Sequence, residues 1–113
     1  MIEVLDLSLN FLGEERSQAL IKALPPQIKE LNLSFNYILD SGVERLAERL
    51  AENFSLVSLN LQENKITRVA QLCQSLKLSA CQGTLKYLNL TNNLVELDDY
   101  DELGSLIRDA VNL

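Results

Sequence analysis

The chain has 113 residues, of which 47% are hydrophobic and 23% charged, and its formal net charge is −6. This length fits one domain with a modest core. The excess of acidic residues argues against nucleic-acid binding and against docking on an anionic membrane, since both need a basic surface. The sequence has no histidine, the most common general base and zinc ligand. We therefore expect a protein that is not an enzyme and holds no metal or cofactor.

The beginning of the sequence has neither a basic segment nor an unbroken apolar run, and no stretch is apolar enough to span a membrane. We therefore expect a cytoplasmic protein. Its two cysteines, Cys73 and Cys81, are then expected to be buried and reduced, although a disulfide between them is an alternative.

A pattern of leucines followed by an asparagine recurs four times and covers nearly the whole chain. Its form is Leu-x-x-Leu-x-Leu-x-x-Asn, with isoleucine as the first residue of two copies. The four copies end at Asn10, Asn36, Asn64 and Asn93, which are 26, 28 and 29 residues apart. A nearly constant period of this length predicts a solenoid, in which each repeat is one small unit.

The Leu-x-Leu centre of each copy predicts a short strand, because alternate side chains of a strand share a face. In the second copy, Leu31 and Leu33 point to one side, whereas Glu30, Asn32 and Ser34 point to the other. The leucine side needs a cover, and the helix that follows each strand is expected to provide it.

The first two helices are predicted over about residues 14–23 and 41–53. The first ends before Pro25 and Pro26, since proline interrupts a helix. The second has apolar residues at the i, i+3, i+4, i+7 spacing of a buried helix face. These residues are Val43, Leu46, Ala47 and Leu50. Asp40 or Ser41 is expected to cap its N-terminus.

The third helix is predicted from Arg68 to near Lys77, and the fourth begins where Asp99 and Glu102 form a capping box. The third helix is expected to bury Val69, Leu72, Cys73 and Leu76, and the fourth Leu103, Leu106, Ile107 and Ala110. A longer, less regular tail follows the third helix over residues 77–84.

Four such units, over about residues 2–27, 28–55, 56–84 and 85–113, would stack into one domain with a parallel sheet on one face and helices on the other. The asparagine at the end of each strand turns the chain away from the sheet. Its amide side chain can satisfy backbone groups of the turn, so stacked copies would form a ladder. We interpret Asn10, Asn36, Asn64 and Asn93 as structural residues.

The pattern is similar to that of the leucine-rich repeat family. The repeat length and the segment from Asn36 through Gly42 to Leu50 resemble the ribonuclease-inhibitor-like subclass. This resemblance implies an α/β solenoid of four strand–helix repeats that binds a protein or peptide through its sheet face. The chain is either complete or a fragment of a longer repeat protein.

The outward positions of the strands are the predicted binding surface. They are Val4, Asp6, Ser8, Glu30, Asn32, Ser34, Ser58, Asn60, Gln62, Tyr87, Asn89 and Thr91, and just beyond them lie Leu9, Phe35, Glu63 and Asn92. Val4, Leu9, Phe35 and Tyr87 are the apolar anchors that a protein interface needs. In the alternative interpretation, the asparagines and serines are simply common at these positions of such repeats and have no binding role.

Five acidic residues crowd the segment 96–102. They could hold a divalent cation, but their spacing matches no calcium loop, and acids at a helix N-terminus explain them. The chain also resembles short repeat proteins that intracellular bacterial pathogens export into the host cytosol by type IV secretion. An acidic cluster followed by the apolar C-terminal Leu113 is similar to such export signals.

Two further expectations concern Arg68 and the first strand. Some longer relatives of the subclass activate GTPases through an arginine in a strand–helix loop, and Arg68 has such a position. The first strand would present an unpaired backbone edge, a template for association. We expect a second copy of the chain, a partner or upstream residues to cover this edge.

Overall fold

The computed structural model describes residues 2–52, 55–79 and 81–109. Short strands alternate with helices along the chain, as the repeat predicts. The elements are β1 (Val4–Asp6), α1 (Gly13–Lys22), β2 (Glu30–Asn32), α2 (Leu39–Leu50), β3 (Ser58–Asn60), α3 (Ala70–Leu78), α4 (Cys81–Thr84), β4 (Tyr87–Asn89), η1 (Leu97–Asp99) and α5 (Tyr100–Asp109). Here η1 is a single 3-10 turn.

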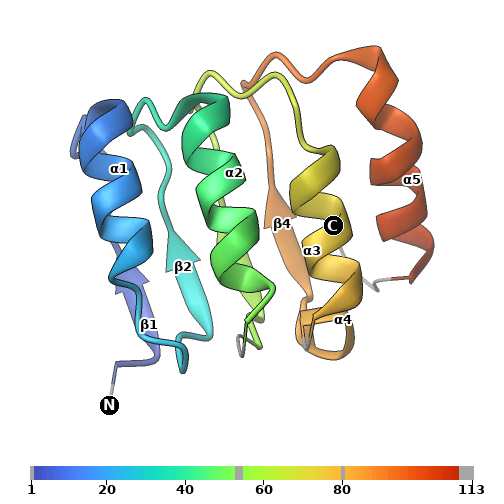
Figure 1. Cartoon of the computed structure of the whole chain (residues 1–113), viewed down its shortest axis with the longest axis horizontal. Helices are drawn as coiled ribbons and strands as arrows, with labels where there is room; N and C mark the ends of the chain where they lie inside the picture. Colours follow the sequence, from blue (N-terminus) through green and yellow to red (C-terminus); the bar gives the residue numbers. More distant parts are fainter. Residues whose placement is uncertain (1, 53–54, 80, 110–113) are drawn as a thin grey trace.

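The four strands form one parallel sheet in the order β1-β2-β3-β4. Figure 1 shows α1, α2, α3 and α5 side by side in front of this sheet, so the molecule has two layers. Its dimensions of 32 × 32 × 19 Å describe a slab about as wide as it is high. The fold predicted from the repeat, with the sheet on one face and the helices on the other, is confirmed.

The core lies between the two layers and consists mainly of leucine and isoleucine. Leu31 and Leu33 of the second repeat are buried, and so are Leu59 and Leu61 of the third. Each of these side chains is covered by a helix and by the neighbouring repeats on both sides. Leu5 and Leu7 of the first repeat are only partly buried, because the described chain has no repeat beyond β1.

The predicted asparagine ladder is present. Asn64 is fully buried, and its Oδ1 accepts hydrogen bonds from the backbone N–H groups of Asn36 (3.0 Å) and Ile38 (3.3 Å) in the preceding repeat. Its Nδ2 donates to the carbonyls of Leu33 and Leu61 at 2.9 and 3.1 Å. The amide thus satisfies turn groups of two repeats at once. Asn36 and Asn93 repeat this arrangement toward Asn10 and Asn64, respectively.

The predicted helix caps are wrong in an informative way. Neither α1, α2 nor α3 has a side-chain cap within its own repeat. Asp40 instead accepts hydrogen bonds from the N–H groups of Thr67 (2.8 Å) and Arg68 (3.0 Å), one repeat later. Ser41 donates its hydroxyl hydrogen to Glu14. Stacking brings the turns of neighbouring repeats together, whereas the prediction considered each repeat alone.

Asp99 likewise binds backbone groups of the preceding repeat and does not cap the helix α5 that follows it. Its carboxylate accepts hydrogen bonds from the N–H groups of Val69 (2.5 Å) and Ala70 (3.3 Å), at the beginning of α3. The predicted capping box of Asp99 and Glu102 is therefore wrong. Burial alone would raise the pKa of Asp99, but hydrogen bonds from Arg68 and Val69 outweigh it and hold the pKa below its usual value.

Helix boundaries differ from prediction by a few residues. Helix α2 begins at Leu39, two residues early, and α3 begins at Ala70, two residues late. The irregular tail after α3 contains the short helix α4. Of the residues that the fourth helix was predicted to bury, Leu106 is buried and Leu103 is partly buried. The side chains of Ile107 and Ala110 lie outside the described residues, as does Asn53.

Candidate functional site

The face of the sheet that is turned away from the helices presents two rows of side chains. The strand register places Val4, Glu30, Ser58 and Tyr87 in one row and Asp6, Asn32, Asn60 and Asn89 in the next. The predicted surface residues of all four strands are therefore brought together on one face.

The second row also has a structural role. The side-chain oxygen at the last position of each strand accepts a hydrogen bond from the backbone N–H two residues later, as in an Asx-turn. The acceptor–donor pairs are Asp6–Ser8, Asn32–Ser34, Asn60–Gln62 and Asn89–Thr91. The interpretation of these asparagines as simply common at these positions is therefore incomplete, because they hold the turns that follow the strands.

Ser34 is not part of the open surface that the sequence predicted. It is buried, and its hydroxyl donates to Asn32 Oδ1 at 2.7 Å. The corresponding hydroxyl of Thr91 makes the same bond to Asn89, but Thr91 is exposed at the end of the stack. Ser34 lies between two neighbouring repeats, which exclude water from it.

The strand-to-helix turns form a second zone, which we call the turn rim. It comprises the residues on either side of the first three ladder asparagines: Leu9, Phe11, Phe35, Tyr37, Glu63 and Lys65. All six have a positive φ, between 47° and 61°. Leu9, Phe35 and Glu63, which each precede an asparagine, were predicted as surface residues. The residues that directly follow the asparagines were not.

Phe11 and Tyr37 form the centre of the turn rim. Their ring centroids are 6.0 Å apart, with the planes tilted by 36°, and Lys65 Nζ lies 5.9 Å from the centroid of the Tyr37 ring. Together with Phe35 and Glu63, these side chains line a small hollow of about 60 Å³. The signal for Phe11 and Tyr37 was available, because each directly follows a ladder asparagine.

Comparison with known proteins agrees with this architecture. A family model described as Leucine Rich repeat matches residues 26–47 and 52–68. The fold is a leucine-rich repeat solenoid. The matched segments include most of the second repeat and the strand and turn of the third. No curated protein matches the sequence.

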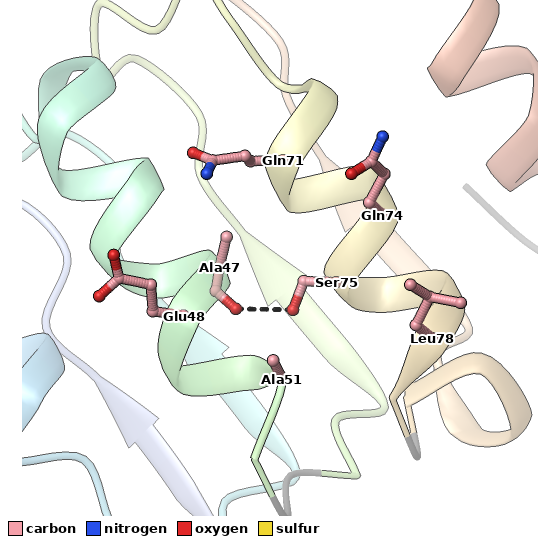
Figure 2. Close-up of a pocket in the computed structure, with 7 residues that line it drawn as sticks. All are labelled: Ala47, Glu48, Ala51, Gln71, Gln74, Ser75 and Leu78. Carbon is pink, nitrogen blue, oxygen red and sulfur yellow. Dashed lines mark hydrogen bonds between the residues drawn. The ribbon is translucent and has the colours of Figure 1, made fainter.

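On the helical side of the leucine-rich repeat solenoid, a groove of about 290 Å³ lies between α2 and α3 (Figure 2). Ser75 donates its hydroxyl hydrogen to the carbonyl of Ala47 at 2.6 Å across the floor of this groove. This bond fixes one helix against the other. Leu78, at one end, is 88% exposed.

The side chain of Arg68 is about half exposed and binds Asp99 of the following repeat. Its Nε lies 3.2 and 3.3 Å from the two carboxylate oxygens of Asp99, and its Nη2 lies 3.1 Å from Oδ1. Hydrogen bonding to Asp99 raises the pKa of the Arg68 guanidinium. A guanidinium held in this way has a structural role, and nothing in the geometry favours the GTPase-activating alternative.

No three acidic or cysteine side chains come together as a metal site within residues 2–52, 55–79 and 81–109. Cys73 and Cys81 are free and buried. Burial, followed by the nearby charges of Glu102 and Asp99, raises the pKa of Cys73 to about 12, so its thiol is unreactive. Residues 110–113, which end the proposed export signal, lie outside the described residues.

None of the described helices is long and apolar enough to span a membrane. The strand β1 forms hydrogen bonds to β2 on one side. Ile2, which precedes β1, and Val4, its first residue, are exposed. Association through this edge stays a prediction, which light scattering on the purified chain would test.

Proposed function

We propose that this leucine-rich repeat solenoid is a protein-binding module whose contact surface is the turn rim together with the outer face of the sheet. Leucine-rich repeats generally mediate protein–protein interactions and are typically not enzymes. The full helices in the repeats, such as the 12 residues of α2, support placing the chain in the ribonuclease-inhibitor-like subclass. The two free thiols support a reducing compartment such as the cytoplasm.

The observation that carries this proposal is the choice of residues at the turn rim. Left-handed backbone conformations favour glycine and asparagine and cost other residues about 1–3 kcal/mol. The sequence nevertheless has leucine, phenylalanine or tyrosine at four of these positions. Leu9, Phe11 and Tyr37 are also 61%, 62% and 46% exposed. Apolar residues that cost stability twice, in backbone strain and in exposure, indicate a surface that a partner covers.

The sheet face adds polar contacts in fixed positions. The Oδ1 atoms of Asn32 and Asn60 are engaged by the turns, so each side chain has a defined orientation. No acceptor for their Nδ2 groups lies within hydrogen-bonding distance among the described residues. These groups are therefore available to donate to a partner, next to the exposed ring of Tyr87. Preorganised donors beside apolar anchors favour specific binding.

A peptide-display selection tests the proposal without knowledge of the natural partner. The wild-type chain is immobilised, and the affinities of the selected peptides are measured for Phe11→Asn and Tyr37→Asn. Asparagine tolerates the left-handed conformation, so these substitutions remove the ring and keep the turn. Each should weaken binding by about thirtyfold, which corresponds to the roughly 2 kcal/mol of a hot-spot residue.

Leu78→Asn is the matched control, because it removes an apolar side chain that is 88% exposed from the helical side. It should leave the affinities unchanged. If Leu78→Asn weakens binding and the two rim variants do not, the contact surface lies on the helices and the proposal is wrong.

A further inference from the structure

The first row of the sheet face contains a notch. Ser58 has the smallest side chain of its row, and the longer side chains of Glu30 and Tyr87 flank it on the adjacent strands. Since neighbouring strands are about 4.8 Å apart, the backbones of the two flanking residues are separated by roughly 10 Å. The resulting depression has a volume of about 230 Å³, and Val4, Asp6 and Asn60 also line it.

The charges around this notch have one sign. The outward positions of the four strands include two carboxylates, Asp6 and Glu30, and no lysine or arginine. Hydrogen bonds from Ser8 lower the pKa of Asp6, so its carboxylate is ionised at neutral pH. Within the described part of the chain, neither carboxylate is paired in a salt bridge. The notch therefore has an unneutralised negative wall.

The opposite wall is aromatic. Tyr87 lines the notch and is about half exposed. An aromatic ring attracts cations to its face, and it stacks with the flat guanidinium group of arginine. A carboxylate binds the same guanidinium through two parallel hydrogen bonds. A notch with a carboxylate on one side and an aromatic ring on the other thus complements a flat cation on a long, slender side chain.

We propose that the notch binds an arginine side chain from an extended segment of a protein partner. This inference rests on the proposed function and adds the chemistry of the partner to it. The slender side chain of arginine fits between Glu30 and Tyr87, whose backbones lie roughly 10 Å apart. The side-chain amides of Asn32 and Asn60 lie in the adjacent row, where they can donate to carbonyls of the partner's backbone. An acidic segment or a phosphate group would be repelled by Asp6 and Glu30.

The test uses a synthetic peptide, acetyl-Val-Ser-Arg-Ser-Val-amide, titrated into isotopically labelled protein and followed by the chemical shifts of backbone amides. The shifts should be concentrated at Glu30, Ser58 and Tyr87. A peptide with citrulline in place of arginine has the same shape without the charge. It should bind about two- to fivefold more weakly, as expected for the loss of one exposed ion pair and cation–π contact.

Variants of the protein separate the walls of the notch. Glu30→Gln and Tyr87→Ala should each weaken binding of the arginine peptide by about two- to fivefold, whereas Tyr87→Phe, which keeps the ring, should not. Ser58→Leu fills the notch without changing any charge and should abolish binding. Glu15→Gln, which removes an exposed carboxylate from α1 on the helical side, is the matched control and should have no effect.

Equal affinity for the arginine and citrulline peptides, or unchanged affinity in Ser58→Leu, would overturn the inference. Equal affinity for free acetyl-arginine amide would also overturn it, because the notch would then bind a small cation instead of a protein segment. A failure of this inference can be distinguished from a failure of the proposed function. Display-selected peptides that depend on Phe11 and Tyr37 but not on Glu30 or Ser58 would support a binding module and contradict only the arginine notch.

Discussion

Removing the side-chain amide of Asn64 should be among the most damaging single changes to this protein. Asn64→Ala deprives the N–H groups of Asn36 and Ile38 of their acceptor. The carbonyls that Asn64 binds keep other donors, since Leu33 also accepts from Asn36 Nδ2 and Leu61 from Asn93 Nδ2. The net effect is therefore that two buried N–H groups lose their acceptor.

Each buried polar group that loses its partner costs about 1–3 kcal/mol, so Asn64→Ala should lower the free energy of unfolding by about 2–6 kcal/mol. Asn10→Ala is the matched control at the end of the ladder. Asn10 is exposed, and its Nδ2 donates to the carbonyls of Leu7 and Ser8 within its own turn. Water can replace those bonds, so this substitution should cost about 1 kcal/mol.

Urea denaturation followed by circular dichroism measures both values. The slope of the free energy of unfolding against urea concentration must be the same for the variants and the wild type. Losses for Asn64→Ala and Asn10→Ala that agree within about 0.5 kcal/mol, the usual size of a surface effect, would refute the reasoning. The buried ladder would then contribute no more than an exposed turn.

Four further changes have defined outcomes in the same assay. Leu61→Ala should cost about 2–5 kcal/mol, because Leu61 is fully buried between repeats. Ser17→Ala should stabilise the protein by about 1 kcal/mol, since its buried hydroxyl has no partner among the described residues. Gly42→Ala should destabilise it by about 1–3 kcal/mol, as the added Cβ would overlap the buried side chain of Ile38. Asp99→Asn should lower the free energy of unfolding at pH 7. In acid, the variant should lose less of this free energy than the wild type does.

The sign of the acid effect follows from the lowered pKa of Asp99. A carboxyl group whose pKa is lower in the folded state stabilises the protein above its unfolded pKa of about 3.9, and this contribution disappears as the pH falls through the folded pKa. The wild type should therefore lose more stability than Asp99→Asn as the pH falls below about 4. Parallel curves for the two proteins would contradict this assignment.

Each of the other three predictions, for Leu61→Ala, Ser17→Ala and Gly42→Ala, also has a result that would contradict it. An unchanged midpoint for Leu61→Ala would mean that Leu61 does not lie in the core. A destabilised Ser17→Ala would indicate that the hydroxyl has a partner, and a neutral Gly42→Ala would show that α2 shifts to accept a methyl group.

The sequence alone could predict the fold because its main determinant is periodic. The leucines that alternate in each strand and the asparagine at a fixed distance from them are local signals repeated four times. Repetition allowed the burial of Leu33 and Leu61, and the ladder role of Asn64, to be predicted correctly. Contacts between repeats were harder, because Asp40 and Asp99 bind turns about 30 residues away in sequence. Only the stacked structure shows these partners.

The candidate surface was partly predictable for the same reason. Alternation along the strands identified the outward residues of the sheet correctly. The turn rim lies beyond the strands, where alternation no longer applies, so Phe11 and Tyr37 were missed although each directly follows a ladder asparagine. Ser34 was misplaced because its position counts as outward in a strand but lies beyond the end of β2, in the buried turn.

Photo-crosslinking tests the central claim, that a protein partner binds on the turn rim and sheet face, most directly. Tyr37→p-benzoyl-phenylalanine puts a photoreactive ring in the turn rim, and Gln74→p-benzoyl-phenylalanine puts the same group in the groove between α2 and α3 (Figure 2). Mass spectrometry then locates the crosslinks to a display-selected peptide. We predict crosslinks from position 37 and none from position 74. Crosslinks from position 74 alone would contradict the account.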